Sequence, residues 1–154
     1  MRIIFLDIDG VLNSQLYDLE RGKNDGNIDI TRLMLLKQLI DKTEAKVVLT
    51  SSWRTHWDPE GRDTDEIGKE IEETFSKCGI KLYSKTPQKA DDRALEIQSW
   101  INEHPETECF VIFDDIKFGW RKLESNVIKT DFRIGRGLEY NHIEKAAGIL
   151  LTAK

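Results

Sequence analysis

The sequence has few of the residues on which several classes of protein depend. Its 154 residues include two cysteines, three histidines and three prolines. Two isolated thiols, Cys78 and Cys109, give no disulfide framework and indicate reduced, structural residues. The three scattered histidines show no spacing typical of a metal site. A chain of this length can bury a core without such supports, so we expect a single domain over residues 1–154.

Long apolar runs and excess positive charge are also missing. No run approaches the length of a membrane span, and the four apolar residues after Arg2 are too few for a signal peptide. We therefore expect a cytoplasmic protein with no membrane partner, as a monomer or homodimer. The net charge of −5 disfavours binding along a track of nucleic acid, which needs many basic side chains. The end of a nucleic acid is still an acceptable ligand.

What the sequence does contain is a regular alternation of apolar runs and helical patterns. The runs predict buried strands at 3–6, 46–50, 109–113 and 127–130, and a shorter strand at 80–83. Between them, apolar spacing predicts helices from a cap at Asp29 or Thr31 through Ile40, and over 63–78, 91–104 and 140–151. The polar stretch 13–27 carries only turn signals. This order predicts an α/β fold, a Rossmann-like three-layer sandwich with a central parallel sheet.

Polar side chains follow three of these strands at the point where each strand ends. In a parallel sheet these ends meet at one edge, where ligands bind. The residues are Asp7 and Asp9 after the first strand, Thr50, Ser51 and Arg54 after the second, and Asp114 and Asp115 after the third. Gly10 lets the chain turn away. Carboxylates without histidine or cysteine suit Mg²⁺, and hydroxyls with a guanidinium suit phosphoryl oxygens. The pattern favours phosphoryl transfer.

The same residues resemble the signatures of the haloacid dehalogenase (HAD) superfamily, most of whose members are Mg²⁺-dependent phosphatases. The segment Asp7-x-Asp9-Gly10-Val11-Leu12 is similar to the first signature, Val47 to Thr50 to the second, and Phe113-Asp114-Asp115 to the acidic fourth. The stretches Phe5 to Asn13 and Thr50 to Arg54 look closest to small phosphatase domains of RNA-repair and phage proteins. The polar stretch 13–27 is too short for a large cap domain.

The resemblance implies a role for each matching position. Asp7 is the expected nucleophile, which forms an aspartyl phosphate, and Asp9 is the expected general acid and base. Mg²⁺ is expected on Asp7, the backbone carbonyl of Asp9 and Asp114, with Asp115 beside them. The phosphoryl oxygens are expected to be bound by Thr50, Ser51, Arg54 and a basic residue of the third signature. Arg93 fits that signature best, while Lys89 and Lys85 also lie within range.

Several alternatives are left open by the sequence. Arg54 could instead pair with Asp115, and Trp53, Trp57 and Trp120 each suit either the core or a substrate contact, whereas Trp100 suits the core. The expected activity is hydrolysis of a phosphomonoester, with a nucleotide or a nucleic-acid 3′-phosphate as substrate. A phosphotransferase or mutase of the same fold, or a phosphate-binding regulatory protein without turnover, would share the same motifs.

Overall fold

The centre of the molecule is a parallel β-sheet. The computed structural model describes residues 1–89, 91–117 and 119–152. The strands are β1 (Arg2–Leu6), β2 (Lys46–Leu49), β3 (Leu82–Lys85), β4 (Cys109–Asp114) and β5 (Val127–Lys129). They pair in parallel in the order β3-β2-β1-β4-β5. Strand β1 thus lies in the middle of the sheet, and the predicted fold class is confirmed. Cys78 and Cys109 are free and half-buried.

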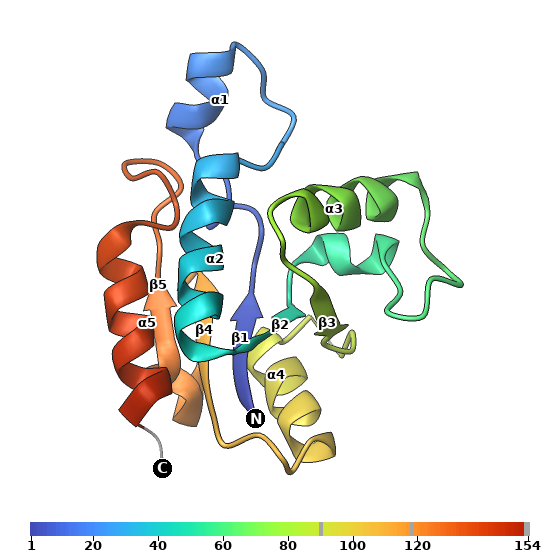
Figure 1. The fold of residues 1–154 in the computed structure, drawn as a ribbon, viewed down its shortest axis with the longest axis vertical. Coiled ribbons are helices and arrows are strands. Elements are labelled where there is room, and N and C mark those ends of the chain that lie inside the picture. The colour runs from blue at the N-terminus through green and yellow to red at the C-terminus, as the bar shows by residue number, and fades with distance from the viewer. Residues whose placement is uncertain (90, 118, 153–154) are drawn as a thin grey trace.

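Helices cover both faces of this sheet (Figure 1). The helices are α1 (Gln15–Arg21), α2 (Ile30–Thr43), α3 (Glu66–Lys77), α4 (Arg93–Glu103) and α5 (Tyr140–Thr152), with 3-10 turns η1 (Ser52–His56) and η2 (Arg121–Asn126). Helices α2 and α5 pack side by side on one face, and α4 covers the other. Helix α3 packs against η1 beyond the end of β2. No described helix is both long and apolar enough to cross a membrane.

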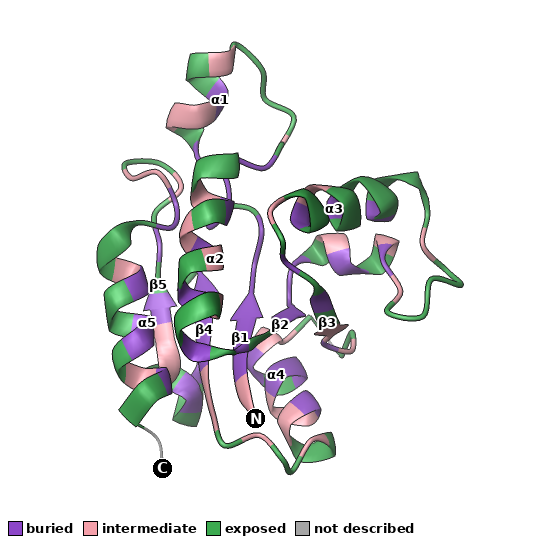
Figure 2. Cartoon of the chain, viewed as in Figure 1, coloured by how far each residue is buried: buried purple, intermediate pink, exposed green. Residues whose placement is uncertain are grey.

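Alternate residues of β1 supply the two halves of the core. Ile4 and Leu6 pack towards α2 and α5, whereas Ile3 and Phe5 pack towards α4. All four are fully buried, as expected for a strand covered on both faces, and buried positions run along the sheet in Figure 2. The core thus fixes β1 from both sides and gives the residues that follow it a rigid base.

Three local features differ from the sequence-based expectation. The polar stretch 13–27 contains the short helix α1, whose N-terminus is capped by Ser14 and which ends at Gly22 in the left-handed region. Strand β3 begins at Leu82 rather than residue 80, because the Ile80 N–H donates to the Phe75 carbonyl at the end of α3. Helix α3 is capped by Asp65, whereas the sequence predicts a helix from residue 63. For α2, the cap is Asp29, one of the two residues that the sequence offers.

Candidate active site

The ends of β1, β2 and β4 bring their polar residues to one edge of the sheet. The Asp7 N–H donates to the Phe113 carbonyl over 3.1 Å, and the Thr50 N–H donates to the Leu6 carbonyl over 2.9 Å. These hydrogen bonds continue the strand pairing by one residue on each side of β1. The three acidic or hydroxyl-bearing segments therefore meet, as the sequence predicts.

Three carboxylates gather at this edge. One oxygen from each of Asp7, Asp114 and Asp115 lies within 4.8 Å of the others. Asp7 and Asp114 are buried, and Asp115 is half-buried. Burial and the neighbouring Asp114 raise the pKa of Asp7 from 3.8 to about 7, although Arg93 opposes this. Burial and Asp114 also raise the pKa of Asp115. Repulsion among the three carboxylates disfavours their simultaneous ionisation, and a bound cation would offset that repulsion.

The donor set of this carboxylate cluster fits a hard divalent cation. All its ligand atoms are oxygens, which Mg²⁺ prefers. Among the described residues, the Asp115 Oδ1 atom is buried and has no hydrogen-bond partner. Buried polar atoms without a partner are rare in folded proteins and call for an ion, a water or a ligand. An ion bound at this edge would therefore satisfy an atom that the described protein residues leave unsatisfied.

Arg93 is the basic residue that the structure places beside the cluster. It begins α4, which Asp92 caps, and its Nη1 atom lies 2.7 Å from Asp114 Oδ2 and 3.4 Å from Asp7 Oδ2. The other two candidates bind elsewhere. Lys89 is exposed and donates to Ser99, and the Lys85 ammonium donates to the carbonyls of Arg54 and Trp57.

The two hydroxyl residues after β2 differ in their hydrogen bonds. Thr50 is fully buried, and its Oγ1 atom has no partner among the described residues. The Ser51 Oγ atom accepts the Trp53 N–H over 3.2 Å and so caps η1. The Thr50 hydroxyl is thus not bound by any described residue, while the Ser51 hydroxyl supports the turn that follows.

The guanidinium of Arg54, a candidate for binding phosphoryl oxygens or Asp115, is bound to other protein groups in this structure. Arg54 is buried, and its Nη2 atom lies 2.7 Å from Glu96 Oε2. Its other N–H groups donate to the backbone carbonyls of Thr50, Ser51 and Thr86. The guanidinium thus braces the loop after β2 against α4.

A sequence model of one protein family matches nearly the whole chain. The family is described as the HAD domain in Swiss Army Knife RNA repair proteins, and the match covers residues 3–141. The chain belongs to this family. The resemblance read from the motifs is therefore confirmed, and with it a HAD-type hydrolase fold that has no large cap. A search of the curated proteins finds no match.

In this HAD domain the carboxylate of Asp9 is held apart from the three clustered acids. Asp9 is exposed, and its Oδ1 and Oδ2 atoms accept hydrogen bonds from Asn13 Nδ2 over 3.0 Å and from Trp53 Nε1 over 2.9 Å. Its side chain lies outside the carboxylate cluster. That its backbone carbonyl binds a metal stays a prediction. Two donors fix the direction of the proposed acid and base.

Asn13 is a residue of the candidate site to which the sequence analysis gives no role of its own. Besides holding Asp9, its Nδ2 atom donates to the Gly26 carbonyl over 3.0 Å, and its Oδ1 atom accepts the Gly10 N–H over 2.8 Å. The available signal is an amide side chain four residues after an aspartate in a turn, because an amide both donates and accepts. Asn13 thereby fixes the loop that follows β1.

Gly10 is required by its conformation and its surroundings. Its φ angle is +82°, in the left-handed region, and a Cβ atom built on it would lie 2.2 Å from the Asp115 Cγ atom. Any side chain here would displace Asp115 from the cluster. The expectation that Gly10 lets the chain turn away is confirmed, and the close approach of Asp115 adds a second reason for glycine.

The tryptophans divide between the core and the surface near the site. Trp57, Trp100 and Trp120 are buried, with exposed fractions of 2–3%. Trp57 also donates its indole N–H to Glu72. Only Trp53 among these four is half-buried, and it contacts Asp9. The open question of packing or substrate contact is thus settled as packing for Trp57 and Trp120, and Trp53 is left as the candidate.

Proposed function

We propose that this HAD domain is a Mg²⁺-dependent phosphatase that hydrolyses a phosphomonoester through an aspartyl phosphate on Asp7. One observation carries the proposal. A nearly buried carboxylate, two further carboxylates, a guanidinium and a buried hydroxyl without a partner among the described residues meet at one sheet edge. A nucleophile, charge-neutralising groups and a donor for phosphoryl oxygens are what phosphoryl transfer requires.

The metal would be held by Asp7, Asp114 and Asp115, together with the backbone carbonyl of Asp9. When bound, Mg²⁺ would offset the repulsion among the carboxylates and the charge of the phosphoryl oxygens. It would also keep Asp7 ionised near neutral pH, where its own raised pKa of about 7 leaves it partly protonated. The carboxylate would then be ready to attack.

Two displacements would complete the reaction. First, an Asp7 carboxylate oxygen bonds to phosphorus, the ester P–O bond breaks, and Asp9 gives its proton to the leaving oxygen. Then Asp9 takes a proton from a water molecule, the water oxygen bonds to phosphorus, and the Asp7–phosphorus bond breaks to release inorganic phosphate. Thr50 and Arg93 would donate hydrogen bonds to the phosphoryl oxygens as charge develops on them.

The expected substrate class is a nucleotide or a nucleic-acid 3′-phosphate. The family description refers to RNA repair proteins, which supports a substrate of this chemistry. A net charge of −5 supports recognition of a terminus or a mononucleotide rather than of a long strand. The short α1 segment in place of a large cap argues against a transferase or mutase, because those enzymes must exclude water from the intermediate.

Phosphate release tests this proposal. Wild type, Asp7→Asn and Asp63→Asn would be assayed with Mg²⁺ or with chelator, on nucleotides, sugar phosphates and 3′- or 5′-phosphorylated oligonucleotides. Asp63 is exposed and lies outside the carboxylate cluster, so it controls for the loss of a surface carboxylate. We expect release that needs Mg²⁺ and Asp7 but not Asp63. A folded, Mg²⁺-binding wild type that releases no phosphate would instead favour the transferase or the regulatory protein.

A further inference from the structure

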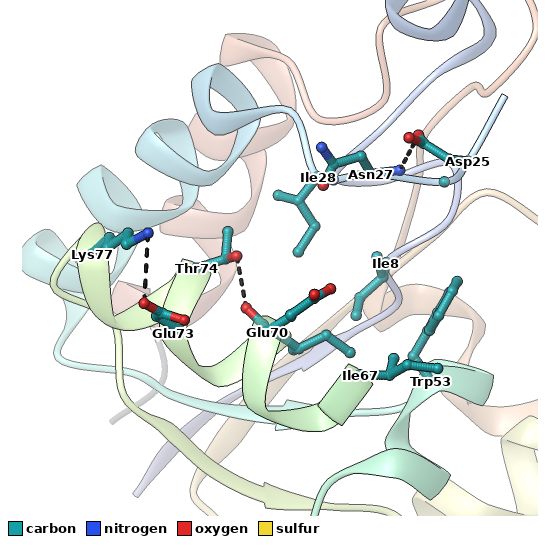
Figure 3. A pocket seen from close by; sticks show the side chains of 12 residues that line it. Ile8, Asp25, Asn27, Ile28, Trp53, Ile67, Glu70, Glu73, Thr74 and Lys77 are labelled. Atoms are coloured by element: carbon teal, nitrogen blue, oxygen red, sulfur yellow. Dashed lines mark hydrogen bonds and ion pairs between the residues drawn. The ribbon is translucent and has the colours of Figure 1, made fainter. Parts of the chain in front are cut away.

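A groove lies beside the proposed acid and base, between α3 and the loop 25–28. Its volume is about 450 Å³, and Figure 3 shows its lining side chains. One wall is formed by α3 and the opposite wall by the loop, while Ile8 and Trp53 close the end nearest the active site. None of these lining residues belongs to the carboxylate cluster, so the groove is an addition to the site described above.

The groove lies next to Asp9, although Asp9 itself does not line it. Ile8, which lines it, is the residue between Asp7 and Asp9, and Trp53 both lines it and donates its indole N–H to Asp9. A Cβ atom built on Gly26 would lie 3.5 Å from Asp9 Oδ1 and 3.6 Å from the Trp53 ring. If Asp9 protonates the leaving oxygen, as the proposed function states, the group attached to that oxygen must extend past Asp9. The groove offers space for that group beside Asp9.

The walls of the groove suit a flat aromatic group. Ile8, Ile28 and Ile71 are buried and form an apolar base, and Ile67 is 39% exposed at the edge. The half-buried indole of Trp53 stands at the end of this apolar surface (Figure 3). Aromatic side chains bind nucleobases by stacking, which contributes about 1–3 kcal/mol per base. A groove whose base is apolar and ends in an indole therefore favours a nucleobase over a sugar or a second phosphate.

Carboxylates outnumber cations among the side chains that line the groove: Asp25, Glu70 and Glu73 against Lys77. Asp25 and Glu73 are paired with Arg21 over 2.6 Å and with Lys77 over 3.7 Å. The Glu70 carboxylate points into the groove in Figure 3, and no hydrogen bond or ion pair to it is found in the part of the chain that the structure describes. A carboxylate accepts hydrogen bonds and repels phosphate. The Glu70 carboxylate, unpaired among the described residues, favours an occupant that brings N–H donors and no negative charge of its own.

We propose that this groove binds the nucleobase of the leaving nucleoside, with the base stacked on Trp53 and its N–H groups donating to Glu70. Guanine is the base that fits this arrangement best. Its ring N–H and its 2-amino group lie side by side and match the two oxygens of one carboxylate. The inference rests on the proposed phosphatase activity, and it adds that the preferred substrate is a guanosine monophosphate or a terminal guanosine phosphate.

The test compares guanosine monophosphate with inosine monophosphate, which lacks only the 2-amino group, as both 3′ and 5′ phosphates. Phenyl phosphate serves as a substrate without a base. Wild type should show kcat/KM roughly tenfold higher for guanosine than for inosine, the effect of one lost hydrogen bond to a charged group. Glu70→Gln should reduce this ratio to about 2 or less. Glu66→Gln, on the same helix but outside the groove, should keep it.

A second measurement on wild type alone covers the case in which Glu70→Gln does not fold. Guanosine, without phosphate, should inhibit hydrolysis of phenyl phosphate competitively and roughly tenfold more strongly than inosine. Equal efficiency for guanosine and inosine phosphates, or an unchanged ratio in folded Glu70→Gln, would overturn the groove assignment while the phosphatase stands. No release from any substrate, phenyl phosphate included, would instead overturn the proposed function.

Discussion

Removal of the proposed nucleophile should make the metal-free protein more stable. Asp7 is buried with Asp114 and Asp115, and Arg93 lies closer to Asp114 than to Asp7. Its pKa is raised from 3.8 to about 7, so ionisation of Asp7 is harder in the folded protein than in the unfolded chain. Asparagine has nearly the same shape, cannot ionise, and keeps an oxygen to accept the Ile8 N–H. Asp7→Asn should therefore remove the free-energy cost of ionising a buried carboxyl and change little else.

The size of the effect follows from the pKa. At pH 8 Asp7 is ionised in both the folded and the unfolded state. The difference between its folded pKa of about 7 and the value of 3.8 then lowers the free energy of unfolding by about 4 kcal/mol. A carboxyl whose folded pKa is raised binds its proton more tightly in the native state, so the cost is absent below about pH 4. It grows as the pH rises and is complete above about pH 7. The gain from Asp7→Asn should thus be about 3 kcal/mol larger at pH 8 than at pH 5.

Urea unfolding in the presence of chelator would measure this at pH 5 and pH 8. Wild type, Asp7→Asn and the surface control Asp63→Asn would be compared. We expect Asp7→Asn to unfold at higher urea than wild type at pH 8, with a smaller difference at pH 5, and Asp63→Asn to follow wild type. A variant that is less stable than wild type at pH 8, or a difference independent of pH, would refute the electrostatic account of the cluster.

Three further predictions follow from the site. Mg²⁺ at a hundred times its Kd should stabilise wild type by about 2.7 kcal/mol, seen as a rise in Tm, and should stabilise Asp114→Asn far less. Arg54→Met should lower the free energy of unfolding, measured by denaturant titration, by about 3–5 kcal/mol, because it leaves the buried Glu96 carboxylate without its ion-pair partner. The double variant with Glu96→Leu should recover part of this loss. Trp53→Phe should keep the circular dichroism spectrum of the folded protein but lower kcat roughly tenfold, because the Asp9 carboxylate loses the hydrogen bond from the indole. An unchanged kcat would exclude a positioning role for the indole.

The strand-end residues could be predicted from the sequence because their positions depend on local pattern and sheet geometry. Buried apolar runs mark β1, β2 and β4, and parallel pairing brings the residues after them together. Asp7, Thr50 and Asp114 need no further information to be placed near one another. The sequence could not choose among Lys85, Lys89 and Arg93, because that choice depends on where α4 begins, which its cap at Asp92 fixes.

The sequence is least informative where a side-chain partner lies far along the chain. Arg54 follows β2 as a phosphate ligand would, but Glu96, on the helix that packs beneath it, takes its guanidinium. Trp53 and Asp9 are 44 positions apart, and no pattern connects them. The failure to predict helix α1 has a different, local cause. Its seven residues show too little periodicity for the sequence to distinguish a helix from a polar loop. Side-chain partners are set by packing, which single-residue patterns do not report.

The buried pair of Arg54 and Glu96 also bears on how the domain loses activity on heating. Arg54 binds the loop that carries Thr50, while Glu96 accepts the Lys89 N–H and lies one turn after Arg93 on α4. The hydroxyl and the guanidinium proposed to bind phosphate are therefore joined through the interior rather than carried on separately mobile loops. Neither can loosen without breaking a buried ion pair, which unfolding of the whole domain would also require. Heat inactivation should coincide with the cooperative unfolding transition rather than precede it.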